Sequence, residues 1–313
     1  MFRFKISWDS SLPLPHMKKS ILKVPQAGIR VALRSYPETR PLPLAISTRI
    51  PLELFELIID FLNGDRETLK VCSSVSKAWL PCCRYHLFRR TLVSPANAFQ
   101  LLALVNFSWS DPSIRFVSSI RHLVIQSQDD RSQHKLRFHN ILHNFLSSSL
   151  ISLEMTGASA FDGNGQLISH LRALPNLCRL TMGSFLFSSF RRFIEVICAP
   201  PNLGHLSLTG VEWGDSDTTD LLDIPTIFSL SPRLEYLEIF LSRLHQFLDW
   251  LLWTSDQAEL SIKTLHVGGI GIEETAALSQ FLGVLGPRLK HLKMYMRFWL
   301  DHSTLSYLDI SRI

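Results

Sequence analysis

Histidines and cysteines are the residues here that could bind a metal or act as nucleophiles, and their spacing favours neither role. His139 and His143 stand four residues apart, which would place both on one face of a helix, and His134 lies nearby. A zinc-protease helix also carries a glutamate beside its first histidine and needs a third ligand elsewhere, and the sequence shows neither. These histidines are therefore interpreted as surface residues.

The five cysteines contain no Cys-x-x-Cys pair, which is typical of reduced thiols inside a cell. The adjacent Cys82 and Cys83 fall in a predicted helix and make no tetrahedral ligand set, so we interpret them as small buried or half-buried residues.

Two glycine clusters lack the rest of a phosphate-binding motif. Gly163-x-Gly165 has no third glycine, and Gly268-Gly269-x-Gly271 has no following Lys-Ser or Lys-Thr, so both are predicted to be loops. No set of serine, histidine and aspartate is recognisable as a catalytic triad. None of these residue sets therefore predicts a catalytic, metal or cofactor site.

The net charge of +5 and the pI near 9.0 would suit a protein that binds nucleic acid or a membrane surface. Residues 1–49 hold nine Lys and Arg residues and two acids, a net of +7, whereas residues 50–313 hold 23 basic and 25 acidic residues, a net of −2. Prolines interrupt residues 1–49, so a flexible basic tail is expected there. Because the remainder offers no basic stripe, we expect binding of neither nucleic acid nor membrane.

The sequence has no segment that resembles a membrane span or a secretory signal. No run of about 18 apolar residues occurs, and charges and prolines interrupt the first twenty residues. Residues 1–40 are basic and poor in acids, like a mitochondrial leader, but their prolines oppose the amphipathic helix that a leader needs. A cytoplasmic location, a nuclear location or both are expected.

Residues 50–93 are predicted to form three short helices, at about 51–62, 65–77 and 81–88. Their ends carry a proline in a first turn, an aspartate cap and an Asn-Gly stop. The first helix is apolar over more of its circumference than one packing face requires. Its second apolar face either is covered by the rest of this chain or belongs to another protein, and the periodicity leaves both alternatives open.

From residue 120 onward, a Leu-x-x-Leu-x-φ unit, in which φ is apolar, occurs eight times. Successive units begin 30, 27, 26, 31, 28, 27 and 16 residues apart, close to the period of leucine-rich repeats except for the last. Amphipathic segments predicted to be helices lie between the units, at His139–Leu146, Gln166–Leu174, Phe190–Ile197, Leu244–Trp253 and Glu273–Leu285.

This alternation predicts an α/β fold, with a leucine-rich-repeat-like solenoid over residues 94–313 after the three helices. Parallel strands would line its concave side and helices its convex side. Residues 94–119 are expected to cap its entry, with Pro95–Phe107 helical and Arg115–Val117 extended.

Strand geometry predicts which side chains face the concave side. If the fourth and sixth residues of each unit point into the core, the third, fifth and seventh face the open side. The C-terminal units carry the more aromatic and polar residues at these positions, as recognition surfaces do. The alternative is that they are ordinary solvated strand residues. The candidate binding residues are Tyr236, Phe240, His266, His291, Lys293 and Tyr295.

The three-helix segment resembles the F-box motif, most closely that of fungal F-box proteins with repeat-type C-terminal halves. The resemblance rests on three runs over about 43 residues: Ile50-Pro51-Leu52-Glu53-Leu54, then Leu69-Lys70-Val71-Cys72-x-x-Val75-Ser76-x-x-Trp79, then His86-Leu87-Phe88-Arg89. The later units are similar to degenerate leucine-rich repeats without the asparagine ladder of regular ones.

This resemblance implies the substrate-recognition subunit of an SCF-type ubiquitin ligase. The F-box would dock on a Skp-family adaptor, and through it on cullin and RING subunits, while the repeats would capture an unknown target protein. The residues expected on the adaptor surface are Pro51, Leu52, Leu54, Ile58, Leu62, Val75 and Trp79. Those expected to pack within the helices are Leu69, Val71, Leu87 and Phe88.

Two other functions stay open at this point. The chain could be a leucine-rich-repeat interaction scaffold that acts outside the ligase, with an F-box that is vestigial or put to another use. A nucleic-acid binder that uses the basic tail is a more distant alternative.

Overall fold

Residues 50–313 form one compact unit. The ranges that the computed structural model describes are 51–110, 117–127, 142, 150–157, 160–161, 165–214, 230–255, 260–296 and 307–310. The expected tail at 1–49 and the histidines at 134, 139 and 143 lie outside these ranges, as does the helix expected at His139–Leu146 except for Leu142. None of the helices in the described ranges is long and apolar enough to cross a membrane.

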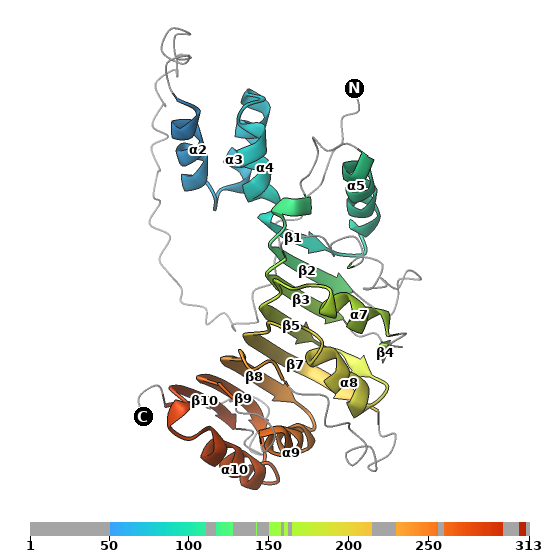
Figure 1. The fold of residues 1–313 in the computed structure, drawn as a ribbon, viewed down its shortest axis with the longest axis vertical. Helices are drawn as coiled ribbons and strands as arrows, with labels where there is room; N and C mark the ends of the chain where they lie inside the picture. The colour runs from blue at the N-terminus through green and yellow to red at the C-terminus, as the bar shows by residue number, and fades with distance from the viewer. Residues whose placement is uncertain are drawn as a thin grey trace, which may run out of the picture. The chain divides into compact units, whose positions relative to one another are not determined.

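Three helices come first in the described chain: α2 at Leu52–Phe61, α3 at Arg66–Val75 and α4 at Leu80–Arg89 (Figure 1). Their bounds are close to the three ranges expected from the sequence. Asp65 caps α3 as predicted, because its Oδ1 accepts a hydrogen bond of 3.0 Å from the backbone N–H of Thr68.

A small core holds these helices together. Ile59 of α2, Leu69 of α3 and Cys83 of α4 are its fully packed members, each at most 2% exposed. The guanidinium of Arg66 also donates a hydrogen bond to the backbone oxygen of Leu87, which ties α3 to α4.

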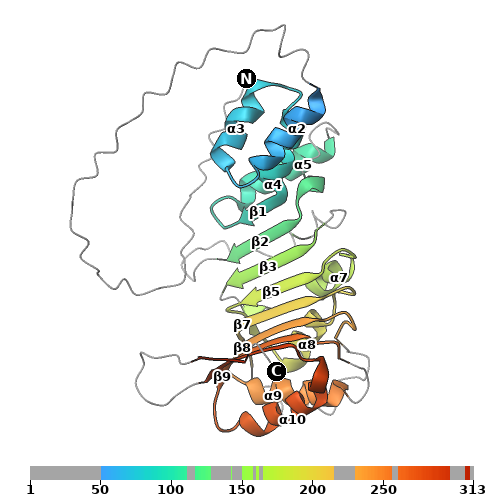
Figure 2. The same cartoon turned by 90° about the vertical axis from the view of Figure 1, so that its left-hand side faces the viewer.

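After α4 the main sheet begins, and its strands follow the order of the chain (Figure 2). Each neighbouring pair from β1 to β10 is parallel, which establishes an α/β fold with a parallel sheet. The strands along this path are β1 at Arg90–Val93, β2 at His122–Ser127, β3 at Ser152–Gly157, β5 at Arg179–Gly183, β7 at His205–Trp213, β8 at Tyr236–Leu241, β9 at Thr264–Ile270, β10 at His291–Met296 and β11 at Tyr307–Ile310.

The repeat unit fixes the register of this sheet. Its fourth-position leucines pair with one another from strand to strand and are all buried, because every strand turns the same face to the core. This row consists of Leu123, Leu153, Leu180, Leu206, Leu237, Leu265 and Leu292.

Helices cover the leucine face of the sheet. Four of them lie within two residues of their predicted ends: α7 at Gln166–Arg172, α8 at Phe190–Ile197, α9 at Leu244–Ser255 and α10 at Thr275–Leu285 (Figure 1). Phe193 of α8 is fully buried in the core that they share with the strands. The entry helix α5 spans Ala98–Ser110, slightly later than the expected Pro95–Phe107.

The eighth unit is not a parallel repeat, so this part of the prediction is wrong. β11 runs antiparallel to β10, with Tyr307 opposite Tyr295. A parallel crossover needs a dozen or more residues and usually a helix, but only ten residues separate Met296 from Tyr307. The last spacing is therefore too short for a parallel crossover and agrees with the antiparallel pairing.

Three further features differ from expectation. β1 was not predicted, because Arg90–Val93 follows α4 directly and was assigned to the helical segment, yet Thr91 and Val93 are buried in the sheet. Val117 lies in a 3-10 helix, Val117–Ser119, rather than in an extended segment. Short strands β4 at Ala160–Phe161 and β6 at Leu186–Phe187 extend the pairing beside the end of β7.

Candidate functional site

An exposed apolar stripe runs along α2. Leu54, Leu57, Ile58 and Phe61 follow the i, i+3, i+4, i+7 spacing of one helix face. They are 50%, 52%, 54% and 82% exposed, whereas Ile59 on another side of α2 is 2% exposed. The sequence left two alternatives for this face: it is covered by the rest of this chain, or it belongs to another protein. Among the described residues, no part of the chain covers it.

The residues predicted for the adaptor surface divide into two groups. Leu62 and Trp79 are half-buried against the small core, and the Trp79 ring lies 4.9 Å from that of Phe55. These two side chains therefore contribute to packing within the helices. The exposed members are Pro51, Leu52, Leu54, Ile58 and Val75.

Sequence reasoning missed part of this apolar surface. Leu57 and Phe61 were not selected, although their helical spacing from Leu54 and Ile58 was a sufficient signal. Val71, which was expected to pack internally, is 63% exposed one turn before Val75 on α3, so that expectation is wrong. Of the other three residues expected to pack, Leu69 is buried, Leu87 lies against the small core and Phe88 lies against the core of the sheet.

All six residues predicted for a target-binding surface lie on β8, β9 and β10. They occur in three cross-strand rows on the face opposite the leucine row. The rows are Tyr236, Thr264 and His291; Glu238, His266 and Lys293; and Phe240, Gly268 and Tyr295. The structure therefore brings the six together on adjacent strands, although their separation in sequence is large.

Tyr236 is the centre of a polar network on this face. The ring of His205 stacks on it with 3.9 Å between centroids, and its hydroxyl shares a 2.9 Å hydrogen bond with Nδ1 of His266. Oε1 of Glu238 lies 3.9 Å from Nδ1 of His266, and Oε2 accepts a 2.7 Å hydrogen bond from the Ser207 hydroxyl. Because Ser207 donates to a carboxylate and not to a histidine, the arrangement differs from that of a serine nucleophile with its base.

Burial keeps the stacked ring pair uncharged. It lowers the pKa of His205 to about 4, and the positive charge of Arg179 adds to this effect. Burial also raises the pKa of Tyr236 to about 12, with a further contribution from the Glu238 carboxylate. Near neutral pH the pair therefore presents a flat, neutral aromatic surface edged by Glu238 and His266.

The depressed pKa of His205 predicts a pH-dependent stability. The unfolded chain takes up a proton on this histidine below about pH 6.5, whereas the fold resists protonation down to about pH 4, so stability is lost as the pH falls through this window. In His205→Gln, the free energy of unfolding should fall less on acidification than in wild type, by on the order of 1 kcal/mol. The difference is this small because the ring is half exposed and solvent screens the effect. Urea unfolding of both proteins at pH 7.5 and pH 4.5 measures it, with His291→Gln as control. An equal pH dependence in wild type and His205→Gln would contradict the assignment.

An aromatic pair lies on the seventh-position row. The rings of Phe240 and Tyr295 are 5.1 Å apart although β9 runs between their strands. Gly268 makes this possible, because a Cβ on that residue would overlap the Phe240 ring. Gly269 next to it has φ +75° at a register shift in β9. The prediction that Gly268 and Gly269 form a loop is therefore wrong, since both are strand residues.

Basic residues gather at the other end of the same face. Arg90 of β1, His122 of β2 and Arg179 of β5 occupy equivalent third positions, with Ser152 between the last two. Burial lowers the pKa of His122, and the guanidinium groups of Arg89, Arg179 and Arg90 lower it further. Sequence reasoning missed Arg90 because it missed β1.

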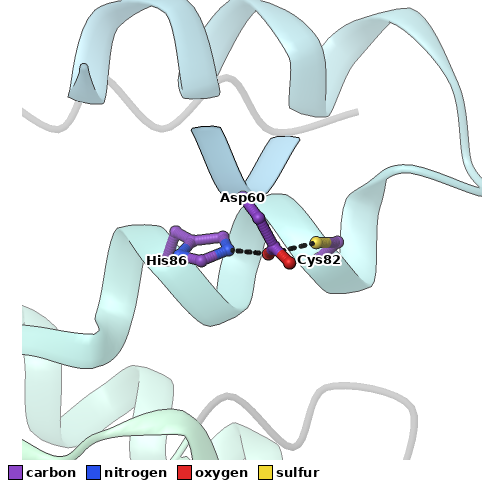
Figure 3. Close-up of side chains that lie close together, drawn as sticks. All are labelled: Asp60, Cys82 and His86. Carbon is purple, nitrogen blue, oxygen red and sulfur yellow. Dashed lines mark hydrogen bonds and ion pairs between the residues drawn. The ribbon is translucent and has the colours of Figure 1, made fainter. Parts of the chain in front are cut away.

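A third group of side chains joins α2 to α4. Asp60, Cys82 and His86 point toward one another, and Nε2–H of His86 donates a 2.7 Å hydrogen bond to Oδ1 of Asp60 (Figure 3). Burial, reinforced by the carboxylates of Asp60 and Glu56, raises the pKa of the Cys82 thiol to about 11. Cys83 is buried and Cys82 half-buried, as predicted. The ligand-like spacing of Cys82 and His86 on one helix was a signal for this cluster in the sequence.

No protein-family model matches this chain, and no curated protein matches it either.

Proposed function

We propose that this protein is the substrate-recognition subunit of an SCF-type cullin-RING ubiquitin ligase. Its α2, α3 and α4 dock on a Skp-family adaptor, which links the chain to cullin and RING subunits, and the sheet captures the target protein. One observation carries the proposal. The helical segment that resembles an F-box exposes the apolar stripe of Leu54, Leu57, Ile58 and Phe61.

The energetics of this stripe support a protein partner. Full burial of a fully exposed apolar side chain of this size stabilises by about 1.5–3 kcal/mol, and these four still expose 50% or more, so covering all of them favours burial by several kcal/mol. The stripe also lacks Lys and Arg, and charge is generally depleted at the centres of protein interfaces. We expect the stripe to bind in an apolar groove of the adaptor, with Glu53, Glu56 and Asp60 at the rim of the interface.

The face of β8, β9 and β10 is the proposed target-binding surface. It combines aromatic rings with a hydrogen-bonded polar network, and Tyr236, Phe240 and Tyr295 are the residue types that anchor interfaces. We take the sheet to be a leucine-rich-repeat-like solenoid with these strands on its concave side. The parallel order and the aligned leucines support that assignment.

The chain itself performs no bond chemistry in this proposal and needs no cofactor. By holding a target near the ubiquitin-conjugating enzyme, it makes the transfer of ubiquitin nearly intramolecular, which raises its rate through effective concentration. The location that fits this role is the cytoplasm, the nucleus or both.

Titration calorimetry of the full-length chain with a purified Skp-family adaptor tests the proposal. We expect a 1:1 complex with a Kd of about 1 μM or lower. A folded chain that shows no binding at about 100 μM adaptor would overturn the ligase assignment. The protein would then be an interaction scaffold that acts outside the ligase and binds its target through the same surface on β8, β9 and β10.

A further inference from the structure

The cluster of Asp60, Cys82 and His86 has the geometry of a metal site (Figure 3). Cys82 and His86 are one turn apart on α4, and Asp60 reaches them from α2. Nε2 of His86 and Sγ of Cys82 lie 2.7 Å and 3.8 Å from the same oxygen, Oδ1 of Asp60, and the three ligand atoms are all within 4.8 Å of one another. Ligand atoms around a tetrahedral zinc ion stand about 3–4 Å apart.

The ligand types select the class of metal. A thiolate, an imidazole and a carboxylate together suit a borderline-soft divalent ion such as Zn²⁺, whereas Ca²⁺ and Mg²⁺ prefer sites built from oxygen alone. The thiolate of Cys82 and the carboxylate of Asp60 would balance the two positive charges. Glu56, one turn before Asp60 on α2, adds negative charge nearby.

The cluster combines a buried histidine with an exposed aspartate. The His86 side chain is 6% exposed, which holds the ring in place, whereas the Asp60 side chain is 58% exposed and leaves a route from solvent. Nδ1 of His86 is buried and has no hydrogen-bond partner among the described residues. A proton placed at Nδ1 would break no existing hydrogen bond of that atom and would offer the lone pair of Nε2 to a metal, at the cost of a buried N–H without a protein acceptor.

We propose that Asp60, Cys82 and His86 bind a zinc-type divalent cation that joins α2 to α4, with water in the fourth position. On binding, Cys82 releases its thiol proton to solvent and coordinates as a thiolate. The Nε2 proton of His86 is lost to solvent, and the neutral ring takes one up at Nδ1. The bound ion replaces the hydrogen bond between His86 and Asp60 with two coordination bonds, so the contact between the helices is kept.

A bound ion would strengthen the attachment of α2 to the other helices. The helix contributes one fully buried residue, Ile59, to the small core, and its apolar stripe faces solvent. An ion that holds α2 to α4 would stabilise the folded chain by mass action, because the unfolded chain does not preform the site. This stabilisation is independent of what α2 binds.

Cobalt and zinc titrations of the reduced full-length chain test the site. Co²⁺ is expected to give a thiolate-to-metal charge-transfer absorption at one equivalent, and Zn²⁺ to displace it with a Kd of about 1 μM or lower. Cys82→Ser should abolish the charge-transfer band, and His86→Gln and Asp60→Asn should each weaken Zn²⁺ binding. In Cys82→Ser and His86→Gln, the Kd for Zn²⁺ should rise by at least about a hundredfold. Cys178→Ser, which changes an exposed cysteine outside the cluster, should bind as wild type does.

Alkylation of the wild-type chain gives a readout that needs no variant. With Zn²⁺ present, the rate of N-ethylmaleimide labelling should fall at Cys82 and stay unchanged at Cys178, as measured by mass spectrometry of the digested protein. Equal labelling of Cys82 with and without Zn²⁺ would overturn the proposal. So would cobalt binding that survives Cys82→Ser but is lost when His139 and His143 are replaced.

Discussion

Replacing Ile58 and Phe61 together with glutamine is expected to weaken adaptor binding by about a hundredfold or more, with the fold intact. Full burial of a fully exposed side chain of this size is worth about 1.5–3 kcal/mol, and Ile58 and Phe61 still expose 54% and 82%, so together they would contribute about 2–4 kcal/mol. About 2.7 kcal/mol corresponds to a hundredfold change in Kd. Because both are more than half exposed in the chain alone, its free energy of unfolding should change by no more than about 0.5 kcal/mol. Calorimetry with the adaptor and urea unfolding measure the two quantities.

Phe99→Gln and Ile272→Gln are the matched controls for this variant. Both residues are 84% exposed, comparable with Phe61 at 82%, but Phe99 is on α5 and Ile272 precedes α10. They should leave adaptor binding unchanged. Equal losses in the controls would mean that general surface hydrophobicity and not the α2 stripe drives binding. Trp79→Ala is a poorer probe, because this ring packs on Phe55 and its removal also destabilises the helices.

The elements that repeat in the sequence were predictable from it. The regular spacing of Leu123, Leu180 and Leu237 predicts that each lies on a strand and pairs with the equivalent leucine of the next strand. This register follows because one apolar face of every strand must be buried. Helix α8 was predicted with its observed ends from its apolar stripe, and in the structure Ser189 caps it by accepting a hydrogen bond from the backbone N–H of Arg192.

Features that depend on contacts between distant residues were not predictable in this way. The strand pairing of Arg90–Val93 leaves no periodic signal in so few residues, whereas the direction of β11 was signalled by the short last repeat spacing. The cluster of Asp60 and His86 requires the packing of α2 on α4, and the ring stack of His205 on Tyr236 requires the register between β7 and β8. These contacts depend on how the elements pack against one another, whereas local sequence specifies only the elements.

Gly268 shows most clearly how such a contact can be tested. Gly268→Ala is expected to lower the free energy of unfolding by about 1–3 kcal/mol, because its Cβ would overlap the Phe240 ring and force it off the strand. The displaced ring would also lose its contact with Tyr295, which near-ultraviolet circular dichroism should detect. Gly183→Ala, on the same row in β5, is the milder comparison. Its Cβ would lie 3.1 Å from the Thr156 side chain, a tight contact that a small shift of that side chain relieves, so a smaller loss of stability is expected.

A double-mutant cycle separates the overlap from any other cost of an alanine at position 268. In a Phe240→Ala background the ring is gone, so Gly268→Ala should be neutral or should stabilise the strand by up to about 1 kcal/mol, because glycine disfavours strands. The coupling energy between the two positions should then be about 1–3 kcal/mol. If Gly268→Ala is equally destabilising with and without the Phe240 ring, the two aromatic rings do not meet above Gly268, and the target-binding surface proposed for β8, β9 and β10 loses its aromatic centre.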